Sequence, residues 1–138
     1  DDDQQHYLFF GGIWGGQLQH WTKGEYSSQD DYPADDAPAL MPKAVKLAAD
    51  MVSMDGEPQD IMILDESGQP IKQGDLDRRF FEAAWVHKYQ DHYYLSYSTG
   101  DTHKIVYAMS ENSHSSKVSG TCFTTIALCQ KGRPICAV

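Results

Sequence analysis

Short stretches in which apolar and polar residues alternate run along the chain, separated by turn-forming residues. The clearest follow one another as AWVHKY at residues 84–89, HYYLSYS at 92–98 and KIVYAMS at 104–110. Within the second stretch Tyr93, Leu95 and Tyr97 share one face, because successive side chains of a strand point to opposite sides. Tight turns at 90–91 and 99–101 connect the stretches. The pattern predicts three successive antiparallel strands, a meander typical of sandwiches, barrels and propeller blades.

The remainder of the chain gives weaker signals. An aromatic run at residues 6–10 stops at two glycines and predicts a strand, and the apolar run at 60–64 predicts a strand that enters a hairpin. Residues 42–54 fit either a helix that begins at a proline or an extended segment. Residues 23–38 are polar and form a long loop, which in a compact domain is usually functional or disordered. These elements predict an all-β fold.

Composition narrows the class of protein and of partner. The chain has 138 residues, of which 41% are hydrophobic and 12% aromatic, enough for one domain with a buried core. The net charge of −9 argues against nucleic acid or an anionic membrane as a partner, since phosphate binding needs a basic face. No apolar run approaches the roughly 20 residues that span a bilayer. A neutral ligand, a cation or a sugar fits this charge better.

The charge is divided unevenly at residue 112. All 20 acidic residues lie in residues 1–112, whereas residues 113–138 have none and contain Cys122, Cys129 and Cys136. These cysteines show neither a CxxC pair nor a fourth ligand, so no zinc site is predicted. We therefore expect a boundary between residues 1–112 and an atypical tail, 113–138.

Glu82 is the sharpest candidate for catalysis. It lies between Phe81 and two alanines at the expected start of a strand. A carboxyl group among apolar side chains favours its protonated form, and such a group can act as a general acid near neutral pH. The alternative is a structural glutamate at a strand entry, paired with Arg78 or Arg79.

Trp14 is a candidate for sugar binding. It stands in GGIWGG, where glycines flank a tryptophan rather than open a helix, so a phosphate-binding loop is not predicted. A tryptophan held on such a turn can present a flat apolar face to a sugar ring. The alternative is a tryptophan that packs within the turn.

Residues 78–112 read RRFFEAAWVHKYQDHYYLSYSTGDTHKIVYAMSEN, and residues 1–21 read DDDQQHYLFFGGIWGGQLQHW. Both stretches closely resemble segments of the family 43 glycoside hydrolases, which are β-xylosidases and α-L-arabinofuranosidases acting on hemicellulose. The combination of FEAAW with YYLSYSTGDTH is the most specific part. The resemblance covers about residues 1–112 and favours an extended conformation for residues 42–54.

This resemblance implies a five-bladed β-propeller that inverts anomeric configuration with a general base, a tuning aspartate and a general acid. Only the acid maps onto this chain, at Glu82, since the two aspartates would lie upstream of Asp1. Trp14 matches a position near the sugar site, and Thr99 and His103 match the loop beside it. No cofactor is implied and no metal site is predicted, with calcium left open.

The resemblance ends after residue 112, and we hypothesise that the tail is out-of-frame or unrelated sequence. A one-base shift in the coding DNA that restores no family-like continuation would contradict this hypothesis. At roughly 40–45 residues per blade, 112 residues form about two blades of a partial propeller. Because open blades expose strand edges and flanks, we expect completion as a homo-oligomer.

Two functions follow from the sequence. The first is a glycoside hydrolase acting on a pentose-containing oligosaccharide or glycoside, with Glu82 as general acid. The second is a non-catalytic oligomeric β-module on which Trp14 and Trp85 stack against sugars. Loss of turnover in Glu82→Gln distinguishes the first from the second.

Overall fold

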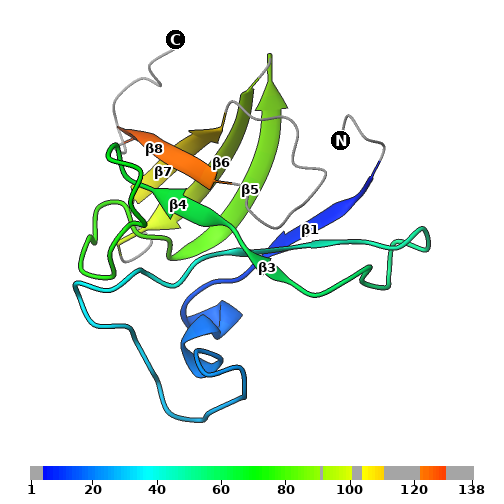
Figure 1. The fold of residues 1–138 in the computed structure, drawn as a ribbon, viewed down its shortest axis with the longest axis horizontal. Helices are drawn as coiled ribbons and strands as arrows, with labels where there is room; N and C mark the ends of the chain where they lie inside the picture. Colours follow the sequence, from blue (N-terminus) through cyan, green and yellow to red (C-terminus); the bar gives the residue numbers. More distant parts are fainter. Residues whose placement is uncertain (1–4, 91, 101–103, 111–121, 130–138) are drawn as a thin grey trace.

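A computed structural model describes residues 5–90, 92–100, 104–110 and 122–129, and its strands form two sheets (Figure 1). The first sheet has the order β1-β2-β3 and the second the order β4-β8-β7-β6-β5. Two short 3₁₀ helices, η1 and η2, follow the first strand. The elements are β1 (Tyr7–Phe10), η1 (Trp14–Gly16), η2 (Leu18–His20), β2 (Lys43–Lys46), β3 (Gln59–Asp60), β4 (Met62–Leu64), β5 (Glu82–Tyr89), β6 (His92–Thr99), β7 (Lys104–Ser110) and β8 (Cys122–Cys129).

Strand pairing in the small sheet determines the conformation of residues 42–54. Strand β2 pairs antiparallel with β1, with Leu8 opposite Val45, and β3 continues the sheet on the other side of β2. Beyond β2 the chain makes a turn closed by a bridge between Leu47 and Met54. The segment is thus extended with a turn, because pairing with β1 outweighs its weak helical periodicity.

The larger sheet contains the predicted meander. Strands β5, β6 and β7 are antiparallel neighbours, and their bounds agree with the predicted stretches to within two residues. Strand β8 adds to β7 in antiparallel orientation and pairs in parallel with β4. The sequence of the tail shows no clear alternation and did not indicate this strand.

The two faces of this sheet differ. One face carries the fully buried Leu95, Tyr97 and Val106, which pack with residues including Ile63 and Phe80 in the core. The opposite face carries aromatic residues at alternate positions of β5, β6 and β7, and we call it the aromatic face. Its rings contact one another in a row formed by Trp85, His87, Tyr94 and Tyr107.

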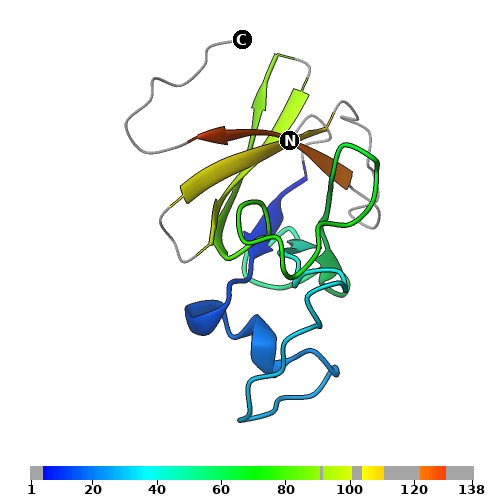
Figure 2. The same ribbon diagram turned by 90° about the vertical axis from the view of Figure 1, so that its left-hand side faces the viewer.

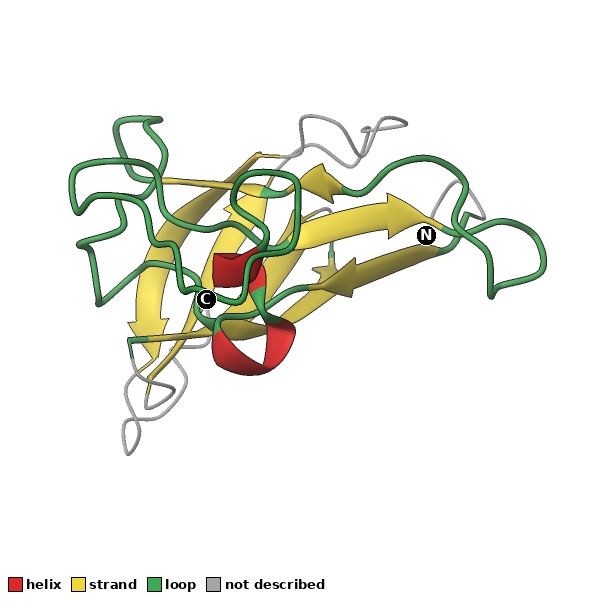
Figure 3. Cartoon of the chain, turned by 90° about the horizontal axis from the view of Figure 1, so that it is seen from below, coloured by secondary structure: helices red, strands yellow, loops and turns green. Residues whose placement is uncertain are grey.

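The 3₁₀ turns and the polar loop project beyond the strands, while Ile13 and Trp14 stay in contact with Phe81. Both η1–η2 and residues 21–42 extend from one end of the molecule (Figure 2), and no α-helix occurs among the described residues, which are strands, loops and short 3₁₀ turns (Figure 3). In this described part, no helix is long and apolar enough to cross a membrane. The prediction of an all-β fold is confirmed.

Candidate functional site

A β-bulge at the start of β5 sets the direction of Glu82. Glu82 pairs with Ser98 and Trp85 pairs with Ser96, so β5 uses three residue steps where β6 uses two. Ala83, within the bulge, has a φ of 61°, which is uncommon for a residue with a side chain. Because paired residues share a face, the extra residue places Glu82 and Trp85 on the same side of the sheet.

The glycine-rich turn after β1 lies directly against Glu82. The Ile13 amide donates a hydrogen bond of 2.7 Å to the Phe81 carbonyl. A Cβ placed on Gly12 would lie 3.2 Å from the Cβ of Glu82, so this glycine permits the close approach of the two segments. Trp14 packs edge-on against Phe81, with 5.1 Å between ring centroids. We call Gly12, Trp14, Phe81 and Glu82 the Glu82 corner.

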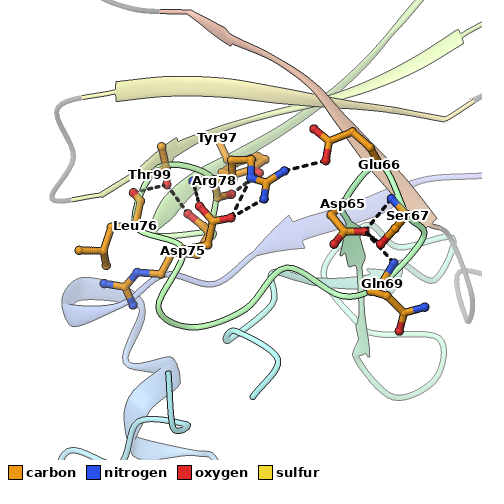
Figure 4. A network of polar contacts seen from close by, with 10 residues as sticks. Asp65, Glu66, Ser67, Gln69, Asp75, Leu76, Arg78, Tyr97 and Thr99 are labelled. Carbon is orange, nitrogen blue, oxygen red and sulfur yellow. Dashed lines mark hydrogen bonds and ion pairs between the residues drawn. The ribbon is translucent and has the colours of Figure 1, made fainter. Parts of the chain in front are cut away.

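The structural alternative for Glu82, an ion pair with Arg78, does not occur. The Arg78 guanidinium instead donates to Asp75 at 2.7 Å and to Glu66 at 2.8 Å (Figure 4). Asp75 and Glu66 together raise the pKa of Arg78, the hydrogen bond to Asp75 contributing most. Within the described residues no ion pair joins Glu82 to Arg79 either. The half-buried Glu82 therefore pairs with neither arginine in the part of the chain that the structure describes.

Three contacts hold the backbone that leads into Glu82. The Tyr97 hydroxyl donates to the Arg78 carbonyl at 2.6 Å, and the Thr99 hydroxyl donates to the Arg79 carbonyl at 2.5 Å. The Phe81 amide donates to the Ser98 carbonyl at 2.9 Å. Strand β6 thus fixes the segment from which Glu82 projects.

Replacing Thr99 by valine tests this support. Thr99 is 0% exposed, and its hydroxyl also lies 3.2 Å from the Leu76 carbonyl, so Thr99→Val leaves buried carbonyls without a donor. We expect the free energy of unfolding, measured by urea denaturation, to fall by about 1–3 kcal/mol. Thr99→Ser keeps the hydroxyl and should lose less. Equal stability of Thr99→Val and the unchanged chain would show that the hydroxyl does not support this segment.

The other predicted site residues are placed differently. Trp85, three residues after Glu82 in β5, is 63% exposed. Its ring stacks on that of His87, with 4.5 Å between the ring centroids. Thr99 is buried beneath the segment before Glu82, with its hydroxyl bonded to main chain. His103 lies outside the described residues. Among the residues that are described, no group of three or more His, Cys, Asp or Glu side chains could hold a metal ion.

Sequence reasoning missed one residue that fixes Trp14. Gln19 is 3% exposed, and its side-chain carbonyl accepts a hydrogen bond of 3.2 Å from the Trp14 amide. Nothing in the local sequence marks Gln19, because the contact depends on how the turn between Trp14 and Gln19 folds.

Comparisons with known proteins relate the chain to xylosidases and arabinosidases. No protein-family model matches the chain. It is 45% identical over 112 residues to a xylosidase/arabinosidase of Bacteroides ovatus, covering 81% of this chain and 34% of the relative. It is 50% identical over 113 residues to xylosidase/arabinosidase 43A of Humicola insolens, covering 77% of this chain and 35% of that protein.

A solved structure is similar over a longer stretch. The GH43 β-xylosidase/α-arabinofuranosidase from a compost microbial metagenome, solved with xylotriose, superposes with a TM-score of 0.81 and 53% identity over 93% of this chain and 38% of its own. The chain spans about a third of the length of the curated relatives it matches.

Proposed function

The chain matches a fragment of the family 43 glycoside hydrolases of the xylosidase/arabinosidase type, and from this premise we propose that it acts on pentosides through the Glu82 corner. Glu82 protonates the glycosidic oxygen of the leaving group, and the exposed indole of Trp14 supports the sugar ring. The observation that carries the proposal is the close packing of the glycine-rich turn against Glu82.

The site residues take different roles in this proposal. Trp14 is 63% exposed beside Glu82 and can present its ring to a ligand. Trp85 contributes a second aromatic surface on the side of the sheet that Glu82 shares. The burial of Thr99 favours support of the Glu82 segment over direct contact with sugar, and a sugar contact by His103 stays a prediction.

Inversion also needs a second carboxylate roughly 6.5–9.5 Å from the acid, with a water between them. We assign this general base to none of the described residues. Asp1–Asp3, which lie outside them, and a carboxylate of another subunit are the two sources within this proposal. The experiment is the turnover of nitrophenyl β-xyloside and nitrophenyl α-L-arabinofuranoside by the chain and by its Glu82→Gln variant.

A non-catalytic sugar-binding module is the second candidate. It is favoured by the exposure of Trp14 and Trp85, which lets both rings stack on a sugar without any general base. This candidate requires that xylo-oligosaccharide perturb tryptophan fluorescence while no nitrophenyl pentoside is hydrolysed.

We also propose that the chain forms a partial five-bladed propeller, with residues 1–112 as its family-like part, and completes its surface as a homo-oligomer. The aromatic face leaves Trp85 and Ile105 more than half exposed, and burial of such a face favours association.

Light scattering at micromolar concentration should therefore give a multiple of the 15.5 kDa chain mass. Ile105→Lys should shift the mass toward the monomer, because it places a charge in the aromatic face. Val52→Lys, in the exposed turn after β2, is the matched control and should leave the mass unchanged. A monomeric mass for the unchanged chain would refute the oligomer.

A further inference from the structure

We infer that Arg78 is a positioning residue for Glu82, and that its ion pairs hold the proposed acid in place. The inference rests on the proposed function and deepens it, because it names a side chain outside the Glu82 corner on which proton transfer depends. Its starting point is the guanidinium of Arg78, which lies between the carboxylates of Asp75 and Glu66 (Figure 4).

The first arm of Arg78 closes the turn that leads toward the acid. Two nitrogens of its guanidinium, Nε and Nη2, each lie 2.7 Å from the same carboxylate oxygen of Asp75. The other oxygen of Asp75 accepts a hydrogen bond of 3.1 Å from the Arg78 amide, and the Asp75 carbonyl accepts one of 2.8 Å from the Arg79 amide. Since charge-assisted hydrogen bonds are the stronger class, the guanidinium reinforces a turn in which Asp75 holds both amides.

The second arm of Arg78 reaches a turn with its own internal hydrogen bonds. Its Nη1 lies 2.8 Å from the Glu66 carboxylate. Next to Glu66, the Asp65 carboxylate accepts hydrogen bonds from the Ser67 hydroxyl at 2.6 Å and from the amides of Ser67 and Gln69 at 2.9 Å. This turn follows β4, which belongs to the same sheet as β5. Arg78 therefore ties the segment before β5 to a braced turn at the end of β4.

The main chain at Arg78 and Arg79 is thus held on both sides. The hydroxyls of Tyr97 and Thr99 donate to the two carbonyls, and Asp75 accepts from the two amides. Without the guanidinium, the Asp75 carboxylate loses its charged partner, and the link to the turn after β4 is gone. Loss of the guanidinium should therefore loosen the entry to β5 while β5 stays paired with β6.

A loosened entry affects proton transfer more than sugar binding. The Glu82 carboxyl must lie within hydrogen-bond reach of the glycosidic oxygen, and a displacement of about 1 Å can cost about 10²-fold in rate. Nitrophenyl β-xyloside is less sensitive, because nitrophenolate leaves with little protonation. The ratio of xylobiose turnover to nitrophenyl β-xyloside turnover therefore reports the position of Glu82. Partial unfolding lowers both rates by the same factor and leaves this ratio unchanged.

The experiment measures the ratio in the unchanged chain and in Arg78→Gln, Glu66→Gln and Glu82→Gln. Arg78→Gln removes the charged fork but keeps a polar side chain. We expect it to lower the ratio about ten- to hundredfold and to change the Kd for xylotriose less than about twofold. The Glu66 side chain is 72% exposed, and an exposed ion pair is weak, so Glu66→Gln should lower the ratio about two- to fivefold.

Lys104→Gln is the matched control. The Lys104 ammonium pairs with Asp77, the residue before Arg78, so this substitution also removes a cation from the same turn. It leaves the amides of Arg78 and Arg79 bonded to Asp75 and should leave the ratio unchanged.

An unchanged ratio in Arg78→Gln, with a lowered ratio in Glu82→Gln, would overturn the inference, because the acid would then keep its place without Arg78. Equal falls in Arg78→Gln and Lys104→Gln would overturn it as well, since any charge lost from the turn would have the same effect. If the unchanged chain hydrolyses neither substrate, or Glu82→Gln leaves the ratio unchanged, the proposed function fails and the inference falls with it. That failure is recognised without reference to Arg78→Gln.

Discussion

Glu82→Gln should abolish most turnover of an unactivated pentoside such as xylobiose while leaving sugar binding intact. General acid catalysis contributes about 10²–10⁴-fold, and glutamine has the shape of glutamate but no proton to transfer at neutral pH. The loss should be smaller on nitrophenyl β-xyloside, because nitrophenolate leaves with little protonation. Turnover of both substrates by the purified chain and its variant measures this difference.

Glu57→Gln is the matched control for that substitution. Glu57 is exposed in the turn before β3, away from the Glu82 corner, and its replacement should not affect turnover. A Glu82→Gln variant that hydrolyses xylobiose as fast as the unchanged chain would exclude Glu82 as the acid. Equal losses in Glu82→Gln and Glu57→Gln would point to a general effect of charge instead.

Gly16→Ala should disrupt the Glu82 corner without touching Glu82 or Trp14. A Cβ on Gly16 would lie 2.6 Å from the carbonyl carbon and 3.0 Å from the carbonyl oxygen of Gly11, a clash with backbone that only a shift of the turn relieves. Gly11 and Gly16 stand on either side of Trp14 in the turn. We therefore expect the shift to move the indole away from its place beside Glu82. We expect at least a tenfold rise in the Kd for xylotriose, and a loss of about 1–3 kcal/mol of unfolding free energy, as overpacking usually costs.

Gly15→Ala provides the comparison, because a Cβ on Gly15 meets nothing within 4 Å. Calorimetric titration with xylotriose and urea denaturation of both variants should therefore separate the two adjacent glycines. If Gly16→Ala binds xylotriose as tightly as Gly15→Ala, the close packing of the turn does not determine the sugar site.

The meander could be predicted because its signal is local. Aromatic and β-branched residues alternate with polar ones through residues 84–110, and Tyr97 lies on the buried face with Leu95 as the alternation requires. The candidate roles of Glu82 and Trp14 came from an apolar setting and from a family resemblance. Their proximity could not be read from the sequence, since it depends on the packing of β1 and its turn against β5.

Other parts depended on contacts between distant residues. Ala83 gives no sign of the bulge that turns Glu82 and Trp85 to one face, because alanine has no special preference for a positive φ. The polar loop gave no sign that the Asp31 amide would bond to the carbonyl of Gln19, whose side chain holds the Trp14 amide. Strand β8 forms by adding to the edge of β7, so its position follows from the sheet rather than from the tail's own pattern.

The most direct test of the sugar site is a titration of the ¹⁵N-labelled chain with xylotriose, followed by NMR. If the Glu82 corner binds a pentose, the Trp14 indole and the Glu82 amide should shift together, with one dissociation constant. Trp21, whose ring packs against Tyr26 and is not part of the Glu82 corner, should shift little. The absence of any shift, or shifts confined to residues outside the Glu82 corner, would contradict the assignment of this corner as a pentoside site.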